Sequence, residues 1–91
     1  MHFDWDRRKA SGNLKKHGVS FEEAETVFSD DLFLIFLDPD HSFDEKRFII
    51  MGESDRRRLL VVAYTERSDS IRIISARKAT RKERKVYEEE I

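Results

Sequence analysis

The chain has 91 residues, of which 41% are charged, and its formal net charge is −1. This length suits one folded domain, residues 1–91, with a single modest core. The absence of cysteine excludes a disulfide framework, thiolate zinc sites and a thiol nucleophile, and it favours a reducing cytoplasm. No apolar run reaches the roughly 20 residues of a membrane helix, and the N-terminus lacks the apolar stretch of a signal peptide.

Capping residues predict three helices. Asp6 is a good N-cap for a helix that runs to His17 with Ala10 and Leu14 on one face, and a glycine then ends it. The segments Ser20–Glu23 and Thr80–Glu83 are capping boxes, which start a second helix and a terminal helix. The clearly apolar members of the terminal helix are Val86, Tyr87 and Ile91.

Four apolar segments predict strands. Leu59–Thr65 and Ile71–Arg77 are rich in β-branched residues and flank a polar turn, which is typical of a hairpin. The first of these strands is apolar on both faces and is therefore expected at the centre of the sheet. Leu32–Leu37 has the length of a buried strand, and Lys46–Met51 forms another. We expect an antiparallel meander of four strands with helices packed on it.

Basic residues cluster in the last third of the chain. Arg72 and Arg77 interrupt the second hairpin strand, and Arg81, Lys82 and further cations open the terminal helix, whose end is acidic. This order opposes the helix macrodipole, so local helix stability does not explain it. An anionic ligand would explain the cluster, and so would packing or solubility.

The acidic turn suggests a metal site as one interpretation. Asp38, Asp40, His41, Asp44 and Glu45 offer ligands for a hard cation. Short polar residues beside a proline are also ordinary turn formers, and we favour that simpler interpretation, with no metal or cofactor. The sequence motifs of phosphate-binding loops, dinucleotide sites, zinc proteases and nucleophile elbows are absent.

RNA cleavage needs only a proton carrier and positive charge, because the 2′-hydroxyl of RNA is itself the nucleophile. Arginine suits the charged phosphorane through its planar, permanently charged fork. His17 is the candidate proton carrier, since histidine has an ordinary pKa of about 6.5. Its other explanation is a favourable position at a helix C-terminus. Tyr87 could orient or protonate the substrate, or it could dock the terminal helix, and Tyr64 is expected in the core.

Two long blocks, Asn13–Ala24 and Ile73–Glu83, resemble the BrnT family of bacterial toxins. The resemblance covers almost the whole chain, including Asp38–His41, Leu59–Val62 and Tyr64–Arg67. It implies a RelE-like α+β fold, a ribonuclease activity that halts translation, and a BrnA-type antitoxin encoded beside the toxin. It leaves a dimer or a toxin–antitoxin hetero-oligomer open. The resemblance favours the basic and polar positions Lys16, His17, Arg47, Arg72, Arg77 and Arg81. Together with the residues themselves, it leads us to expect catalytic roles for Lys16, His17, Arg72, Arg77 and Arg81, and substrate binding by Arg47, Lys82 and Tyr87.

Our first hypothesis is therefore a metal-independent endoribonuclease in which arginines bind phosphate and His17 or Lys16 handles protons. The second is a non-enzymatic module whose basic face binds an acidic protein or nucleic acid. A metal-dependent nuclease that uses the acidic turn is a third. An antitoxin that silences the enzyme is expected to cover the arginines, either with acidic residues or by steric blockage.

Overall fold

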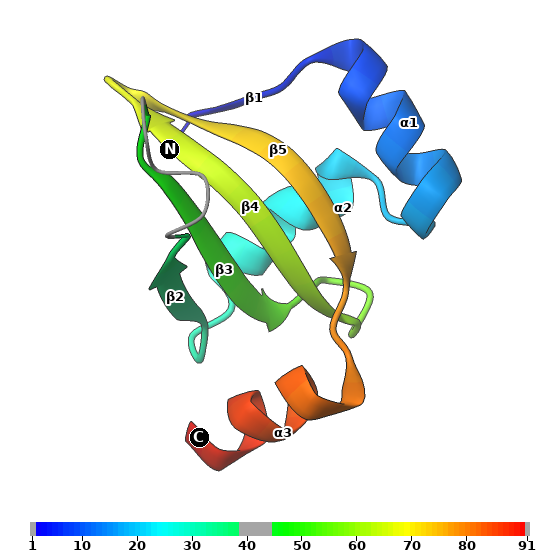
Figure 1. Ribbon diagram of the computed structural model, residues 1–91, viewed down its shortest axis with the longest axis vertical. Helices are drawn as coiled ribbons and strands as arrows, with labels where there is room; N and C mark the ends of the chain where they lie inside the picture. Colours follow the sequence, from blue (N-terminus) through cyan, green and yellow to red (C-terminus); the bar gives the residue numbers. More distant parts are fainter. Residues whose placement is uncertain (1, 39–44, 91) are drawn as a thin grey trace.

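The computed structural model describes residues 2–38 and 45–90. Its elements in chain order are β1 (His2–Asp4), α1 (Arg7–His17), α2 (Phe21–Thr26), the short 3-10 helix η1 (Val27–Ser29), β2 (Leu34–Leu37), β3 (Arg47–Glu53), β4 (Leu59–Arg67), β5 (Ser70–Lys78) and α3 (Arg81–Glu90). The strands form one sheet in the order β1-β5-β4-β3-β2 (Figure 1). This arrangement confirms the predicted α+β fold class and the central place of β4.

The described part of the sheet has five strands where four were predicted. The additional strand is β1, which pairs in parallel with Ser70–Arg72 of β5, whereas all other neighbours are antiparallel. Three residues are too few to show an alternating pattern, so only the pairing with β5 reveals this strand.

The predicted helix starts are confirmed. The Asp6 carboxylate accepts the Lys9 N–H at 3.0 Å, and the Ser20 hydroxyl accepts the Glu23 N–H at the same distance. Gly18 ends α1 with φ of 69°, a left-handed conformation that glycine adopts without steric cost. These caps satisfy backbone donors that have no partner inside the helix.

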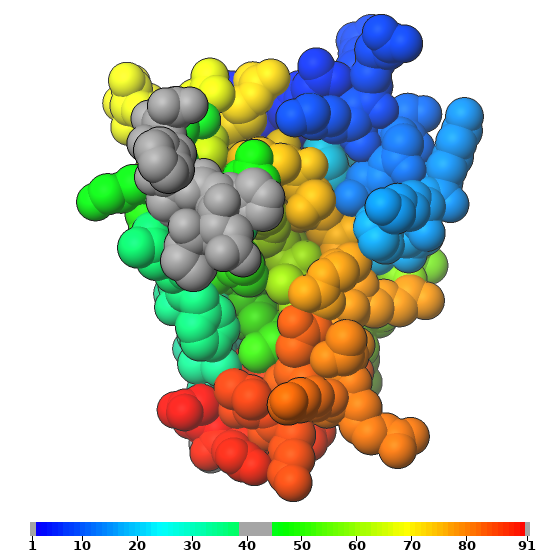
Figure 2. Space-filling view, in the orientation of Figure 1, coloured from blue at the N-terminus to red at the C-terminus, as the bar shows by residue number. Residues whose placement is uncertain are grey.

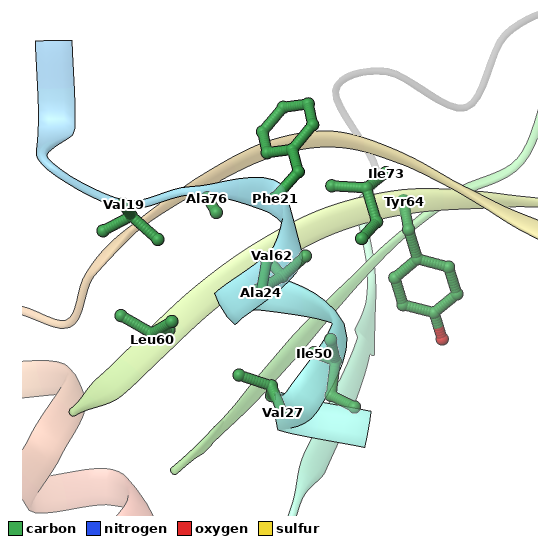
Figure 3. Close-up of a cluster of buried hydrophobic side chains, with 10 residues drawn as sticks. All are labelled: Val19, Phe21, Ala24, Val27, Ile50, Leu60, Val62, Tyr64, Ile73 and Ala76. Carbon is green, nitrogen blue, oxygen red and sulfur yellow. The ribbon is translucent and has the colours of Figure 1, made fainter. Parts of the chain in front are cut away.

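The main core lies between the sheet and the first two helices. Figure 1 shows α2 behind the strands, α1 beside β5, and α3 at the lower end of the sheet. Phe21 and Ala24 of α2 pack with sheet residues such as Ile50 and Val62, and all four are fully buried (Figure 3). A smaller cluster on the other face joins Met51 and its neighbours to Tyr87 of α3.

The prediction that Leu32–Leu37 is a buried strand was wrong. The strand β2 begins only at Leu34 and pairs with β3, and the described residues place no strand on its other side. Ile35 and Leu37 are 47% and 54% exposed. The prediction used hydrophobic content alone, whereas the burial of a strand depends on what covers its faces and edge.

The docking residue of α1 is Asn13. Ala10 packs against the core as expected, but Leu14 on the same predicted face is 51% exposed. The Asn13 amide donates to the carbonyl oxygens of Ala76 and Val19 at 2.7 and 2.9 Å, and its oxygen accepts the Ala76 N–H at 3.0 Å. One side chain thereby pairs with the outer edge of β5, beyond the short β1.

Replacement of Asn13 by alanine is expected to lower the free energy of unfolding by about 2 kcal/mol, since it leaves the N–H and C=O of the buried Ala76 without this partner. Urea denaturation measures the change. The exposed Lys15 on the same helix provides a control, and Lys15→Ala should alter stability little. Equal stability of Asn13→Ala and wild type would contradict this role.

Candidate functional site: the open face of the sheet

One face of β3, β4 and β5 points away from α1 and α2. Side chains alternate along a strand, so the neighbours of the core residues Ile50, Val62 and Ala76 face the other way. We call this surface the open face. Figure 2 shows atoms of β4 and β5 on it, above α3. From the strand registers, it carries Arg47, Ile49, Met51, Val61, Ala63, Thr65, Arg72, Ser75 and Arg77.

Two predicted site residues lie in one row across the open face. In the strand registers, Arg47 pairs with Thr65 and Thr65 pairs with Arg72. Neighbouring strands are about 4.8 Å apart, so the Cα atoms of the two arginines are about 10 Å apart. Thr65, between them, is 2% exposed, and its hydroxyl oxygen makes no hydrogen bond to the described residues. Sequence reasoning did not select Thr65, because only the pairing shows its place.

Arg72 reaches the neighbouring strand β1. Its guanidinium lies 3.3 Å from the carboxylate of Asp4, and the two side chains are 33% and 43% exposed. An ion pair with this exposure contributes at most about 1 kcal/mol, since water screens it. Arg72 can therefore turn to an anionic ligand at small energetic cost.

Arg77 is held by the first turn of α3. Its two terminal nitrogens donate to the two carboxylate oxygens of Glu83 at 2.8 and 2.9 Å. Glu83 also accepts the Thr80 N–H and donates its own N–H to the Thr80 hydroxyl, which confirms the second capping box. The hydrogen bonds from Arg77 lower the pKa of Glu83 to about 2, so this carboxylate is charged at neutral pH. The positive charge of Arg77 is therefore paired with the negative charge of Glu83.

Two further predicted cations flank the corner where the end of β5 meets the start of α3. Arg81 and Lys82 begin α3, and both are exposed. The Arg77–Glu83 pair fixes the start of α3 beside the end of β5, which brings these cations near Arg77. The corner thus combines charges from a strand and a helix.

Tyr87 docks α3 onto the sheet. Its ring is 8% exposed, and its hydroxyl donates to Asp30 at 2.6 Å. Burial and the Asp30 carboxylate raise the pKa of Tyr87 to about 12. Of the two roles considered for Tyr87, these contacts belong to the docking role.

The structure places Lys16 and His17 apart from the arginine row, in the last turn of α1. Lys16 is exposed and His17 half-buried. The next residue, Gly18, accepts a hydrogen bond from Arg58 at 3.1 Å. No hydrogen bond or ion pair joins either side chain to Arg72 or Arg77 among the residues that the structure describes.

A hollow of about 300 Å³ opens between α3 and the strands. Its apolar wall is formed by Phe36, Ile49, Met51, Val61 and Val86, and Arg77 and Glu83 complete the lining. An apolar surface beside an arginine can accommodate the face of a nucleobase, because bases stack on apolar and aromatic side chains. Sequence reasoning missed this hollow, since its lining comes from four strands and a helix.

Most of the acidic turn considered as a metal site lies outside the described residues, including Asp40, His41 and Asp44. Within residues 2–38 and 45–90, no cluster of three or more histidine, aspartate or glutamate side chains could hold a metal ion. None of the described helices is long and apolar enough to cross a membrane.

A five-stranded sheet with α1 and α2 on one face, and with α3 beside the arginines of the other, defines a small α+β protein. The family model described as "Ribonuclease toxin, BrnT, of type II toxin-antitoxin system" matches residues 5–83. The chain therefore belongs to the BrnT family. It is a ribonuclease toxin of a type II toxin–antitoxin system, with RNA as its target and an antitoxin as its partner.

The fold agrees with a solved structure of this family. The 1.1 Å crystal structure of the Brucella abortus ribonuclease toxin BrnT superposes with a TM-score of 0.66. The two sequences are 24% identical, and the match covers 89% of this chain and 99% of the Brucella chain. No relative was found among the curated proteins.

Proposed function

We propose that this toxin is a metal-independent endoribonuclease that binds RNA across the open face. The row of Arg47, Thr65 and Arg72 carries the proposal, since the strand registers place two arginines on either side of one residue, on three neighbouring strands. Arg77 and Arg81 extend the cationic surface toward α3. Arginine contacts with phosphate oxygens would position the chain and offset the charge that develops during cleavage.

The reaction proposed is attack of a 2′-hydroxyl on the adjacent phosphorus. A base removes the 2′-hydroxyl proton, the bond from phosphorus to the 5′-oxygen breaks, and an acid protonates that oxygen. The products are a 2′,3′-cyclic phosphate and a 5′-hydroxyl. His17 or Lys16 serves as a proton carrier, with the RNA reaching from the open face past the edge of β5 to the end of α1.

Several finer features belong to the same proposal. The chain acts as one domain over residues 1–91 in the cytoplasm, without a cofactor. Its partner is a BrnA-type antitoxin, with which it forms a hetero-oligomer, and Lys82 assists in binding RNA. The family supports an antitoxin in general, and the BrnA type follows from the sequence resemblance.

Cleavage of end-labelled single-stranded RNA in excess EDTA tests the mechanism. We expect the wild-type protein to cleave and to leave cyclic phosphate ends, because no step needs a metal. His17→Ala should abolish cleavage while RNA affinity changes little, since a proton carrier acts in the chemical step. His2→Ala, at an exposed histidine of β1, is the matched control. Activity that is lost in EDTA and restored by magnesium would contradict metal independence, and an active His17→Ala variant would exclude His17.

A further inference from the structure

The most exposed apolar side chains of this protein gather on one segment. Seven large hydrophobic residues in the described part of the chain stand out by their exposure, and five of them belong to the segment from residue 32 to residue 37. We call these five the β2 patch: Leu32, Phe33, Ile35, Phe36 and Leu37, each between 43% and 54% exposed. Such a concentration of apolar surface is typical of a protein interaction site.

The β2 patch has the geometry to receive an additional strand. Within the described residues, β2 pairs with β3 alone and lies at the end of the sheet. An edge strand presents N–H and C=O groups to which an extended segment can bind. Its apolar residues lie on both faces of the sheet, because successive side chains alternate.

Each face of the sheet also offers a hollow beside β2. On the side of α2, a hollow of about 370 Å³ is lined by Phe33 and Ile35 together with core residues such as Phe28 and Tyr64. On the open face, Phe36 lines the hollow of about 300 Å³ that also contains Arg77. An added strand would direct alternate side chains toward the two hollows.

The charges before the patch and on its α2 side do not suit RNA. Asp31 precedes the strand and is exposed, and the hollow on the α2 side is also lined by Glu66 and Asp69. Carboxylates repel phosphate groups, whereas they attract lysine and arginine. The occupant is therefore a protein segment with basic residues beside its apolar ones.

Negative charges at both ends of the apolar run argue against a second copy of the chain as the occupant. Asp30 and Asp31 precede the apolar run, and Asp38 follows it. Antiparallel pairing of two β2 strands would bring Asp31 of each copy toward Asp38 of the other, and parallel pairing would align equal residues. Like charges at facing positions destabilise a strand pair.

We propose that β2 is the docking strand for the antitoxin, which adds an extended segment of alternating apolar residues flanked by lysine or arginine. This inference rests on the family's antitoxin partner and is independent of the proposed cleavage chemistry. Because Phe36 belongs both to the patch and to the hollow beside Arg77, an antitoxin anchored here can continue onto the open face. The antitoxin would then be bound at the opposite edge of the sheet from β1 and its neighbour β5.

The test measures the dissociation constant between purified toxin variants and the antitoxin encoded beside this toxin. Ile35→Asp should weaken binding roughly 30-fold or more, as expected for a central interface residue. Leu37→Asp is a second variant at an even more exposed position, and Leu14→Asp on α1 is the matched control. RNA cleavage by each free variant should equal that of wild type, because these side chains lie outside the arginine row.

A second measurement tests the charge of the partner. Asp31→Lys should weaken the complex, with the largest effect at low salt, because it reverses a charge that faces basic residues. Hydrogen exchange in the complex should protect the β2 amides. Unchanged antitoxin affinity in both Ile35→Asp and Leu37→Asp would overturn the proposal. So would a toxin dimer that Ile35→Asp dissociates while antitoxin affinity stays constant, since the patch would then serve a second copy.

Discussion

An Arg77→Ala variant is expected to cleave RNA about 100-fold more slowly than wild type, the usual loss when one donor to a charged transition state is removed. Arg77 is positioned for this task by its two hydrogen bonds to Glu83. Its removal also leaves the Glu83 carboxylate beside the phosphate path without its main countercharge. Both effects act in the same direction on the rate.

Two comparison variants and a check of folding make this result specific. Arg77→Lys keeps the charge but loses the planar fork, so its rate should fall between those of wild type and Arg77→Ala. Arg56→Ala removes an arginine whose side chain is 72% exposed in the turn between β3 and β4, and it should cleave normally. Circular dichroism checks that each variant is folded. A full rate in Arg77→Ala, or an equal loss in Arg56→Ala, would contradict an RNA site at this corner.

Glu23→Gln is expected to lower the free energy of unfolding by about 2 kcal/mol, because it removes the charge of a buried carboxylate that is hydrogen-bonded to the partly exposed Arg58. The Glu23 side chain is 3% exposed and forms two hydrogen bonds with Arg58, one of them at 2.9 Å. It also accepts the Ser54 hydroxyl at 2.6 Å. Because Arg58 donates to the Gly18 carbonyl as well, the ion pair fastens the junction of α1 and α2 to the turn before β4.

The same variant has a distinct pH dependence. Hydrogen bonds from Arg58 lower the pKa of Glu23 below its ordinary value of 4.5, so the native state favours the charged carboxylate. This contribution is complete above about pH 4.5 and is lost as the pH falls through the lower native pKa. The difference in stability between wild type and Glu23→Gln should therefore shrink on acidification. Urea denaturation at several pH values measures it.

Glu22→Gln is the control for this prediction. Glu22 is the exposed neighbour of Glu23 on α2. Surface changes of this kind usually alter stability by less than about 0.5 kcal/mol. A loss in Glu22→Gln as large as that in Glu23→Gln would show that the Arg58 ion pair is not the cause.

Local sequence signals determined the elements of this fold. Asp6, Ser20 and Thr80 are short polar side chains that cap the backbone donors of their own helices, so their effect can be read from residues a few positions apart. The apolar run of β4 indicated its central position, because a strand that is hydrophobic on both faces needs cover on both. The family also followed from the sequence, since the blocks around His17 and Arg77 are long and local.

Only the tertiary structure decided which charges meet. Asp4 reaches Arg72 because β1 pairs in parallel with β5, across 68 positions of sequence. Pairing over such a distance leaves no periodic signal in either segment. The shared row of Arg47 and Arg72 likewise depends on the register of three strands, while His17 and Lys16 lie on α1.

The tertiary structure also decided what stays exposed. The sequence of residues 32–37 determines that they are hydrophobic, but the position of β2 at the end of the sheet leaves them uncovered. The chemistry of a side chain determines how strongly it avoids water, whereas its burial requires neighbouring elements that cover it. For this toxin, local sequence therefore determined the helix caps and the hairpin. The placement of strands and helices decided the arginine row, the docking role of Tyr87 and the apolar edge.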